Sequence, residues 1–145
     1  MADKQTLLQV KKLDPQAILP KRQTKESAGY DICSLSDYSI PPHGKQLIDT
    51  GLSITVPIGT YGQIAPRSGM SCKGTHVGAG VIDRDYTGHV KVLLFNLNSD
   101  HSIEINTGDR IAQLLLKHIS LCEVSEVEEL ELTSRGDGGF GSTGV

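Results

Sequence analysis

The chain has 145 residues, enough for one domain with a buried core of its own. It contains no Trp, two Phe and four Tyr, so the core must rest on Val, Ile and Leu, which favour β-strands. The formal net charge of −3 at pH 7 lacks the basic excess of proteins that bind nucleic-acid polymers, and we expect no such partner.

Short apolar runs separated by turn residues follow one another along the chain, a pattern typical of β-strands. The runs are 7–13, 47–48, 52–56, 61–65, 77–82, 89–97, 103–105 and 112–124. Residues 50–51 and 57–60 indicate turns between them. The runs 77–82 and 89–97 are expected to form the two arms of a hairpin that turns within 85–88.

Only 68–73 has the features of a helical turn, with Ser68 as a candidate N-cap. Many strands at regular spacing, without helical periodicity, predict an all-β, jelly-roll-like sandwich or barrel with one short helical segment. We assign residues 1–134 to this single domain. Residues 135–145 are Gly-rich and nearly free of aliphatic side chains, which predicts a mobile C-terminal tail.

The cysteines Cys33, Cys72 and Cys122 are widely separated and form no Cys-x-x-Cys or His/Cys pair at metal-ligand spacing. A zinc site is therefore not expected, and free thiols suit a reducing compartment. The first residues lack the apolar stretch of a signal peptide, and no run is long enough to cross a membrane. We expect no membrane association and a cytoplasmic or nuclear location.

Five short segments, far apart in the sequence, each combine Gly with polar groups that can bind an anion or move a proton. They are 28–31 (AGYD), 66–69 (PRSG), 80–86 (GVIDRDY), 108–113 (GDRIAQ) and 135–144 (RGDGGFGSTG).

Residues 80–86 carry the sharpest local signal of the five. On a strand, Ile82 and Arg84 would face one way, and Asp83 and Asp85 the other. One carboxylate could accept a proton from a water molecule. Two carboxylates also arise in an ordinary hairpin with Asp85 near its bend, so this segment alone does not decide between the two interpretations.

The segments 66–69 and 108–113 place cations beside turn residues. Arg67 and Ser68 stand at the expected helix start, where backbone N–H groups favour phosphate, although Pro-x-Ser-Gly is also an ordinary turn. Gln113 lies in an apolar run, where a polar side chain needs a hydrogen-bond partner.

The C-terminal run contains a formal G-x-G-x-x-G spacing, but too few residues follow it for the helix that a dinucleotide fold requires. Its Arg135, Phe140, Ser142 and Thr143 could close over a nucleotide, with phosphate contacts and a ring that stacks on a base. A disordered chain end is the alternative for such a Gly-rich strip.

The order and spacing of the five segments resemble the trimeric dUTPase family over most of the chain. The resemblance implies Mg²⁺-dependent hydrolysis of dUTP to dUMP and pyrophosphate by attack of water on the α-phosphate. This reaction limits uracil in DNA and supplies dUMP for dTMP synthesis. The resemblance also implies a homotrimer in which one subunit supplies the phosphate segments of each site, a second the uracil hairpin and a third the tail.

The resemblance assigns roles to the matching positions. Asp83 would orient and activate the water, Tyr86 would pack against deoxyribose C2′ and exclude a 2′-hydroxyl, and Asp31 would reach the Mg²⁺ through water. Backbone groups of the hairpin would read uracil, and the tail would stack its aromatic ring on the base while holding the outer phosphates. The expected substrate-binding residues are Arg67, Ser68, Gly69, Gly80, Val81, Ile82, Tyr86, Lys91, Gln113, Arg135, Phe140, Gly141, Ser142 and Thr143.

Two other functions remain open at this point. One is a dCTP deaminase, or a bifunctional dCTP deaminase and dUTPase of the same superfamily. The other is a non-catalytic nucleotide-binding regulator. The chain also departs from the family pattern, because 70–76 is one residue shorter than in some members, and His89 and Lys91 replace residues that are more often acidic or neutral and apolar. No role is assigned to any of the five histidines.

Overall fold

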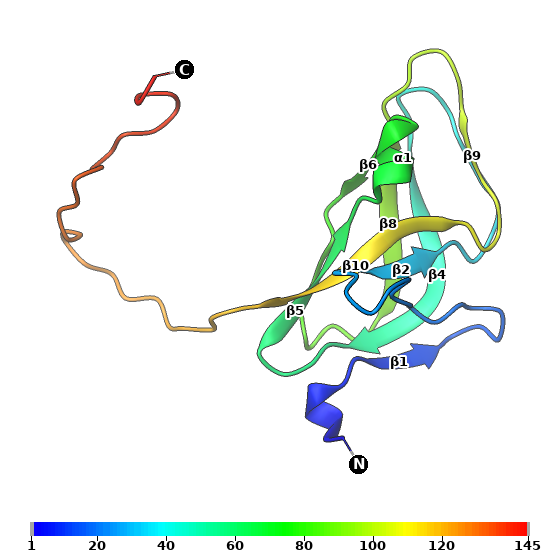
Figure 1. The fold of residues 1–145 in the computed structure, drawn as a ribbon, viewed down its shortest axis with the longest axis horizontal. Helices are drawn as coiled ribbons and strands as arrows, with labels where there is room; N and C mark the ends of the chain where they lie inside the picture. Colours follow the sequence, from blue (N-terminus) through cyan, green and yellow to red (C-terminus); the bar gives the residue numbers. More distant parts are fainter. Residues whose placement is uncertain (1, 145) are drawn as a thin grey trace.

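The computed structural model describes residues 2–144 and consists mainly of antiparallel strands (Figure 1). The strands are β1 (Gln9–Lys12), β2 (Tyr30–Cys33), β3 (Tyr38–Ile40), β4 (Lys45–Thr55), β5 (Thr60–Ala65), β6 (Thr75–Gly78), β7 (Val81–Ile82), β8 (His89–Asn96), β9 (Ile103–Ile105) and β10 (Arg110–His118). They form a sheet A in the order β1-β4-β8-β6, a sheet B in the order β2-β10-β5-β7, and the pair β3-β9. The expected all-β class is confirmed.

Aliphatic side chains of the sheets form the core. In β8 the side chains at every second position, Val90, Val92 and Leu94, are at most 2% exposed, and Ile64 and Leu114 of sheet B belong to the same cluster. This alternation is the strand period expected of a sheet with one buried face. Burying one such side chain contributes about 1.5–3 kcal/mol, so the core forms without aromatic residues, as the composition predicts.

Strand β4 corrects the prediction of two strands at 47–48 and 52–56. It is one strand with a β-bulge between Asp49 and Leu52. Gly51 in the bulge has φ +72°, and a Cβ there would lie 2.9 Å from the Cβ of Ala17. The Thr-Gly pair that indicates a turn in the sequence therefore lies inside a strand as two residues outside the ladder.

The predicted hairpin over 77–97 is confirmed in part: β6 pairs antiparallel with β8, with Val77 opposite Leu94, but residues 81–82 leave this pairing. β7 pairs with β5 of sheet B, while β8 pairs with β4 and β6 of sheet A. Residues 83–88 therefore cross from one sheet to the other. The turn lies at Arg84 and Asp85, closed by the Tyr86 N–H donating to the Asp83 carbonyl at 3.1 Å.

The short helix α1 (Ser68–Cys72) appears where the sequence predicts a helical turn, but its N-cap is Arg67 rather than Ser68, and the cap makes no side-chain hydrogen bond. A short 3₁₀ turn, Lys4–Thr6, was not predicted. Within residues 2–144, neither helix has the length and apolarity needed to span a membrane.

Strand β10 ends at His118, although the apolar run continues to 124. Across the described residues 119–144 the chain forms no strand, and Leu121 and Val124 are 87% and 98% exposed. In Figure 1 this segment runs away from the sheets. The run has strand-like composition but no strand of its own chain beside it, and backbone groups need such a partner to form a ladder.

Candidate functional site

Asp31, Arg67 and Arg110 lie together because β10 is paired with both β2 and β5. One Asp31 oxygen lies 3.2 Å from Arg67 Nε, and the other 3.6 Å from Arg110 Nη1. Gln23 Nε2 also donates to Asp31, at 2.8 Å. The side chain of Asp31 is 13% exposed, so both carboxylate oxygens are engaged in orienting neighbouring groups.

Gln113 has the hydrogen-bond partner that the sequence demands. Its Nε2 donates to the Pro66 carbonyl at 2.8 Å, which fixes the chain just before Arg67. A Cβ at Gly29 would collide with the Gln113 side chain, so only Gly fits at that position. We call Asp31, Arg67, Arg110 and Gln113 the arginine cluster.

The residues beside the arginine cluster are open to solvent. Ser68 and Gly69 are exposed, and a side chain at Gly69 would meet nothing within 4 Å. Arg67 Nη1 donates to the Arg110 carbonyl at 2.9 Å, which holds its guanidinium at this surface. Two guanidinium groups and a free hydroxyl on one surface suit a polyanionic ligand such as a phosphate chain.

A second group of predicted residues surrounds a cavity of about 350 Å³ between the two sheets, which we call the 80–91 cavity. Gly80 has φ +100°, and a Cβ there would lie 2.7 Å from the Ile64 carbonyl oxygen, so this position requires Gly. The residues predicted from the sequence that line this cavity are Gly80, Val81, Ile82, Asp83, Tyr86 and Lys91.

Three contacts place the polar groups around the 80–91 cavity. The Tyr86 hydroxyl donates to the His89 carbonyl at 2.8 Å. Lys91 Nζ lies 3.4 Å from an oxygen of Asp49, which stands opposite it on β4. The Asp83 carboxylate is exposed and makes no hydrogen bond within residues 2–144. A free carboxylate at a cavity edge is suitably placed to accept a proton from water.

His89, to which the sequence analysis assigns no role, also lines this cavity, and its Nε2 accepts a hydrogen bond from the Gly51 N–H at 2.9 Å. Its partner is a backbone group in the bulge of β4, and no spacing in the sequence indicates that contact.

Asp83 and Arg67 lie far apart within one chain. Ile82 is opposite Gly62, so Asp83 is level with Tyr61, six residues before Arg67 along the same strand direction. At the rise of an extended chain, this separates the two backbones by roughly 20 Å. The arginine cluster and the 80–91 cavity are therefore two separate groups of predicted site residues in one chain, and we call each of them a half-site.

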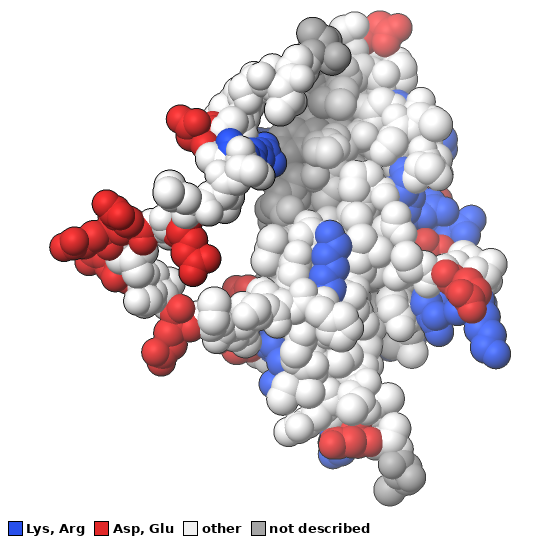
Figure 2. Space-filling model, turned by 60° about the vertical axis from the view of Figure 1, so that its left-hand side comes forward, with Lys and Arg blue, Asp and Glu red and all other residues white. Residues whose placement is uncertain are grey.

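The C-terminal residues lie apart from both half-sites. Arg135 Nε donates to the Gly138 carbonyl at 2.7 Å, and the Ser142 N–H donates to the Gly139 carbonyl at 3.0 Å. The ring of Phe140 is fully exposed. Figure 2 shows acidic side chains gathered along the segment that leads to this tail. The contacts of the tail in the described residues are local, so nothing from its own chain holds it over a site.

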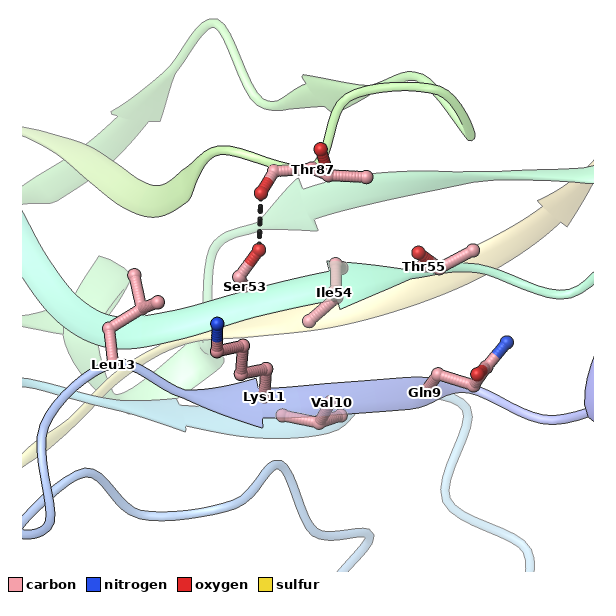
Figure 3. A pocket seen from close by; sticks show the side chains of 8 residues that line it. All are labelled: Gln9, Val10, Lys11, Leu13, Ser53, Ile54, Thr55 and Thr87. Carbon is pink, nitrogen blue, oxygen red and sulfur yellow. Dashed lines mark hydrogen bonds between the residues drawn. The ribbon is translucent and has the colours of Figure 1, made fainter.

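A groove of about 470 Å³ along β1 and β4 contains none of the predicted site residues (Figure 3). Lys11 and Leu13 line it on one side. Ser53 lies on the other, and its hydroxyl donates to the Thr87 carbonyl. The groove therefore reaches the loop 83–88 at Thr87.

Within residues 2–144, no group of three or more His, Cys, Asp or Glu side chains could hold a metal ion. Magnesium usually keeps several waters and is bound through one or two carboxylates together with substrate phosphates. In the arginine cluster the one carboxylate, Asp31, is already engaged by Arg67 and Arg110, so an ion beside it would depend mainly on a ligand's own oxygens.

Comparison with known proteins gives consistent results. A family model described as dUTPase matches residues 15–144. The deoxyuridine 5′-triphosphate nucleotidohydrolase of Arabidopsis thaliana is 56% identical over 137 residues, covering 94% of this chain and 82% of that protein. The Variola virus protein of the same name is 52% identical over 126 residues, covering 87% and 85%. The structure of Staphylococcus bacteriophage 80alpha dUTPase with dUPNHPP has a TM-score of 0.91 at 33% identity, covering 96% and 99%.

Proposed function

This chain belongs to the dUTPase family, and from that premise we propose how its residues divide the work of converting dUTP to dUMP and pyrophosphate. The enzyme is a dUTP nucleotidohydrolase of nucleotide metabolism. The observation that carries the assignment of roles is the grouping of Gly80, Ile82, Asp83, Tyr86 and Lys91 around one cavity.

Asp83 orients the attacking water and accepts its proton. The water oxygen forms a bond to the α-phosphorus while the bond from that phosphorus to the β-bridging oxygen breaks, and pyrophosphate leaves with the electron pair. The free, exposed carboxylate of Asp83 supports this role, since it is not committed to another group in the described chain.

Uracil and deoxyribose occupy the 80–91 cavity. Backbone groups of Gly80, Val81, Ile82 and Lys91 read the base, and the Tyr86 ring covers the deoxyribose C2′ so that a 2′-hydroxyl has no room. The Lys91 side chain is engaged with Asp49 at 3.4 Å, which supports recognition through its backbone rather than its ammonium group.

The phosphates are held by Arg67, Ser68, Gly69 and Gln113, whose chain segment is fixed by the arginine cluster. A bound Mg²⁺ would neutralise charge on the phosphates and the leaving pyrophosphate. Asp31 is the residue that would hold the ion through water, and its contacts with Arg67 and Arg110 support a second role in orienting these guanidinium groups.

The active form is a homotrimer with shared sites, in which the arginine cluster of one copy faces the 80–91 cavity of another and the tail of a third closes the site. The roughly 20 Å between Asp83 and Arg67 in one chain supports this arrangement, because both must act on one triphosphate. The tail, residues 135–145, then acts as a lid on the 1–134 domain, with Phe140 over the base and Arg135, Gly141, Ser142 and Thr143 on the outer phosphates.

We place the enzyme in the cytoplasm or nucleus.

The test is turnover of dUTP and dCTP with Mg²⁺, followed as pyrophosphate and ammonia release. We expect pyrophosphate from dUTP and no ammonia from dCTP; ammonia would support the deaminase instead.

Asp83→Asn should bind the nucleotide and lose about 10²–10⁴-fold in kcat, the usual contribution of a positioned base. Asp85→Asn is the matched control, a neighbouring carboxylate outside the 80–91 cavity lining, and should keep its rate. A wild-type rate in Asp83→Asn would show that another group activates the water.

A further inference from the structure

The ring of His89 is built into the fold beside the 80–91 cavity. His89 is the first residue of β8, and its Nε2 lies 2.9 Å from the backbone nitrogen of Gly51, which donates the hydrogen bond. A ring nitrogen that accepts a hydrogen bond carries no proton, so the geometry assigns the neutral tautomer with its proton on Nδ1. The side chain therefore acts as a fixed acceptor.

Gly51 needs such an acceptor because it lies in the bulge of β4. A bulge leaves residues outside the regular ladder, and here the ladder of β4 with β8 skips Thr50 and Gly51 between Asp49 and Leu52. The Gly51 carbonyl is taken by the Leu13 N–H at 2.8 Å, while its own N–H goes to the His89 ring. The ring thus ties the first residue of β8 to β4 in addition to the ladder pair with Ser53.

The position of Tyr86 depends on residues 88 and 89. Its hydroxyl donates to the His89 carbonyl at 2.8 Å. Its ring lies so close to Gly88 that a Cβ there would be 2.7 Å from the ring and the hydroxyl oxygen. The neighbouring Thr87 carbonyl is held by the Ser53 hydroxyl (Figure 3). The loop that carries Tyr86 is therefore attached to β4 on both sides of Gly88.

We propose that His89 is a positioning residue for sugar selectivity. By accepting the Gly51 N–H, its ring fixes the His89 carbonyl, and that carbonyl fixes the Tyr86 hydroxyl and the ring that excludes a ribose. This inference rests on the role proposed above for Tyr86 and adds to it the structure that holds Tyr86 in place. His89 acts here through Tyr86 rather than by touching the sugar.

The measured quantity is the ratio of kcat/KM for UTP to kcat/KM for dUTP. In His89→Ala this ratio should rise about three- to tenfold. A change of that size corresponds to the loss of one neutral hydrogen bond, here the one from the Gly51 N–H to the His89 ring. His89→Gln should restore most of the wild-type ratio, because its amide oxygen can reach Gly51 as Nε2 does. His101→Ala, which removes an exposed imidazole that contacts Asp100, is the matched control and should keep the wild-type ratio.

A double-mutant cycle distinguishes this role from general destabilisation. Tyr86→Phe removes the hydrogen bond from the Tyr86 hydroxyl to the His89 carbonyl and should raise the ratio of kcat/KM for UTP to that for dUTP by itself. Adding His89→Ala to Tyr86→Phe should then have little further effect, because the carbonyl no longer has a hydroxyl to hold. Thermal unfolding is measured alongside, since a purely structural role would lower the unfolding temperature without changing the ratio.

The outcomes separate this inference from the proposed function. A wild-type ratio in Tyr86→Ala would overturn the role of Tyr86 itself. A raised ratio in Tyr86→Ala together with a wild-type ratio in folded His89→Ala would overturn only the role of His89, as would additive effects in the cycle. If His89→Ala does not fold, Tyr86→Phe decides, because a wild-type ratio there would show that the tie between Tyr86 and His89 does not set selectivity.

Discussion

Single residues in this enzyme behave according to the groups they already contact. Asp31 uses both carboxylate oxygens on guanidinium and amide donors, whereas Asp83 has neither kind of partner within the described chain. We therefore expect different roles for two carboxylates with the same intrinsic chemistry, Asp31 orienting cations and Asp83 accepting a proton from water.

Cys33 shows the same dependence on surroundings. Burial, and then the negative charge of Asp31, raise the pKa of its thiol above the usual range, so less thiolate is present near neutral pH. Under iodoacetamide at pH 8, Cys33 should be alkylated more slowly than the exposed Cys72 and Cys122, as mapped by peptide mass spectrometry. All three should react alike in guanidinium chloride. Labelling of Cys33 as fast as Cys72 in the native protein would contradict this.

Outside the tail, the residues that the sequence singles out lie together in the two half-sites, because each motif is local and its Gly positions are imposed by the backbone, as at Gly80; their roles stay predictions. The sequence could not predict His89 in the same way. The ring of His89 meets Gly51, 38 residues away, and only the register of β4 against β8 brings the two together.

At the scale of elements, pairing partners were harder to predict than the strands themselves. Alternation identifies a strand and its buried face but not its neighbour. The predicted arm 77–82 is therefore divided in the structure, with the end of β6 paired to β8 as expected and β7 paired to β5 in the other sheet. The Thr-Gly pair in β4 failed for a related reason, since a bulge and a turn use the same residues. The run beyond His118 has apolar residues but no strand beside it in this chain.

Asn96, the last residue of β8, hydrogen-bonds to the chain at residues 40, 41 and 101 and should contribute strongly to the stability of the fold. It is 1% exposed, and its Nδ2 donates to the carbonyls of Ile40, Pro41 and His101 at 2.9–3.2 Å. Asn96→Ala would leave these three carbonyls, of which that of Ile40 is buried, without the amide donor and should lower the free energy of unfolding by about 3 kcal/mol. Asn106→Ala, at an exposed loop position, should change it by less than about 0.5 kcal/mol.

The measurement for both asparagine variants is urea unfolding at one fixed protein concentration, because association would add to the apparent stability. Equal urea midpoints for Asn96→Ala and the wild type, with the same dependence of the unfolding free energy on urea, would contradict the prediction. Water would then replace the Asn96 amide with no loss of stability.

At the scale of the whole molecule, the separation of the half-sites predicts complementation between chains. Asp83→Asn damages only the 80–91 cavity and Arg67→Ala only the arginine cluster, so each variant alone should be nearly inactive. If each site combines the two half-sites from different copies of a trimer, random 1:1 co-assembly should restore about a quarter of the wild-type sites. Activity is measured after co-refolding, with light scattering to give the mass.

The control for complementation mixes Arg67→Ala with Gln113→Ala. Both changes lie in the same cluster, so every site of every mixed trimer carries a damaged cluster and no intact site is formed. Recovery in this control, or no recovery from Asp83→Asn with Arg67→Ala, would contradict sites shared between copies. A fully active monomer in light scattering would contradict the trimer itself.

The tail provides the last test, because its contacts in the described chain are only local and any order over a site must come from new contacts with ligand and neighbouring copies. Its Gly content makes the free state entropically favoured, so ordering must be offset by those contacts. Deleting the chain from Arg135 onward should leave the sheets folded but lower kcat by on the order of 10²-fold. Closure of the tail would add the last contacts to the substrate and exclude bulk water from the site. Binding of dUMP should weaken less, because dUMP lacks the outer phosphates that the tail would hold. Hydrogen exchange should slow in the tail when a non-hydrolysable dUTP analogue binds. If the truncated enzyme turns over dUTP at the full-length rate, the site is complete without the tail.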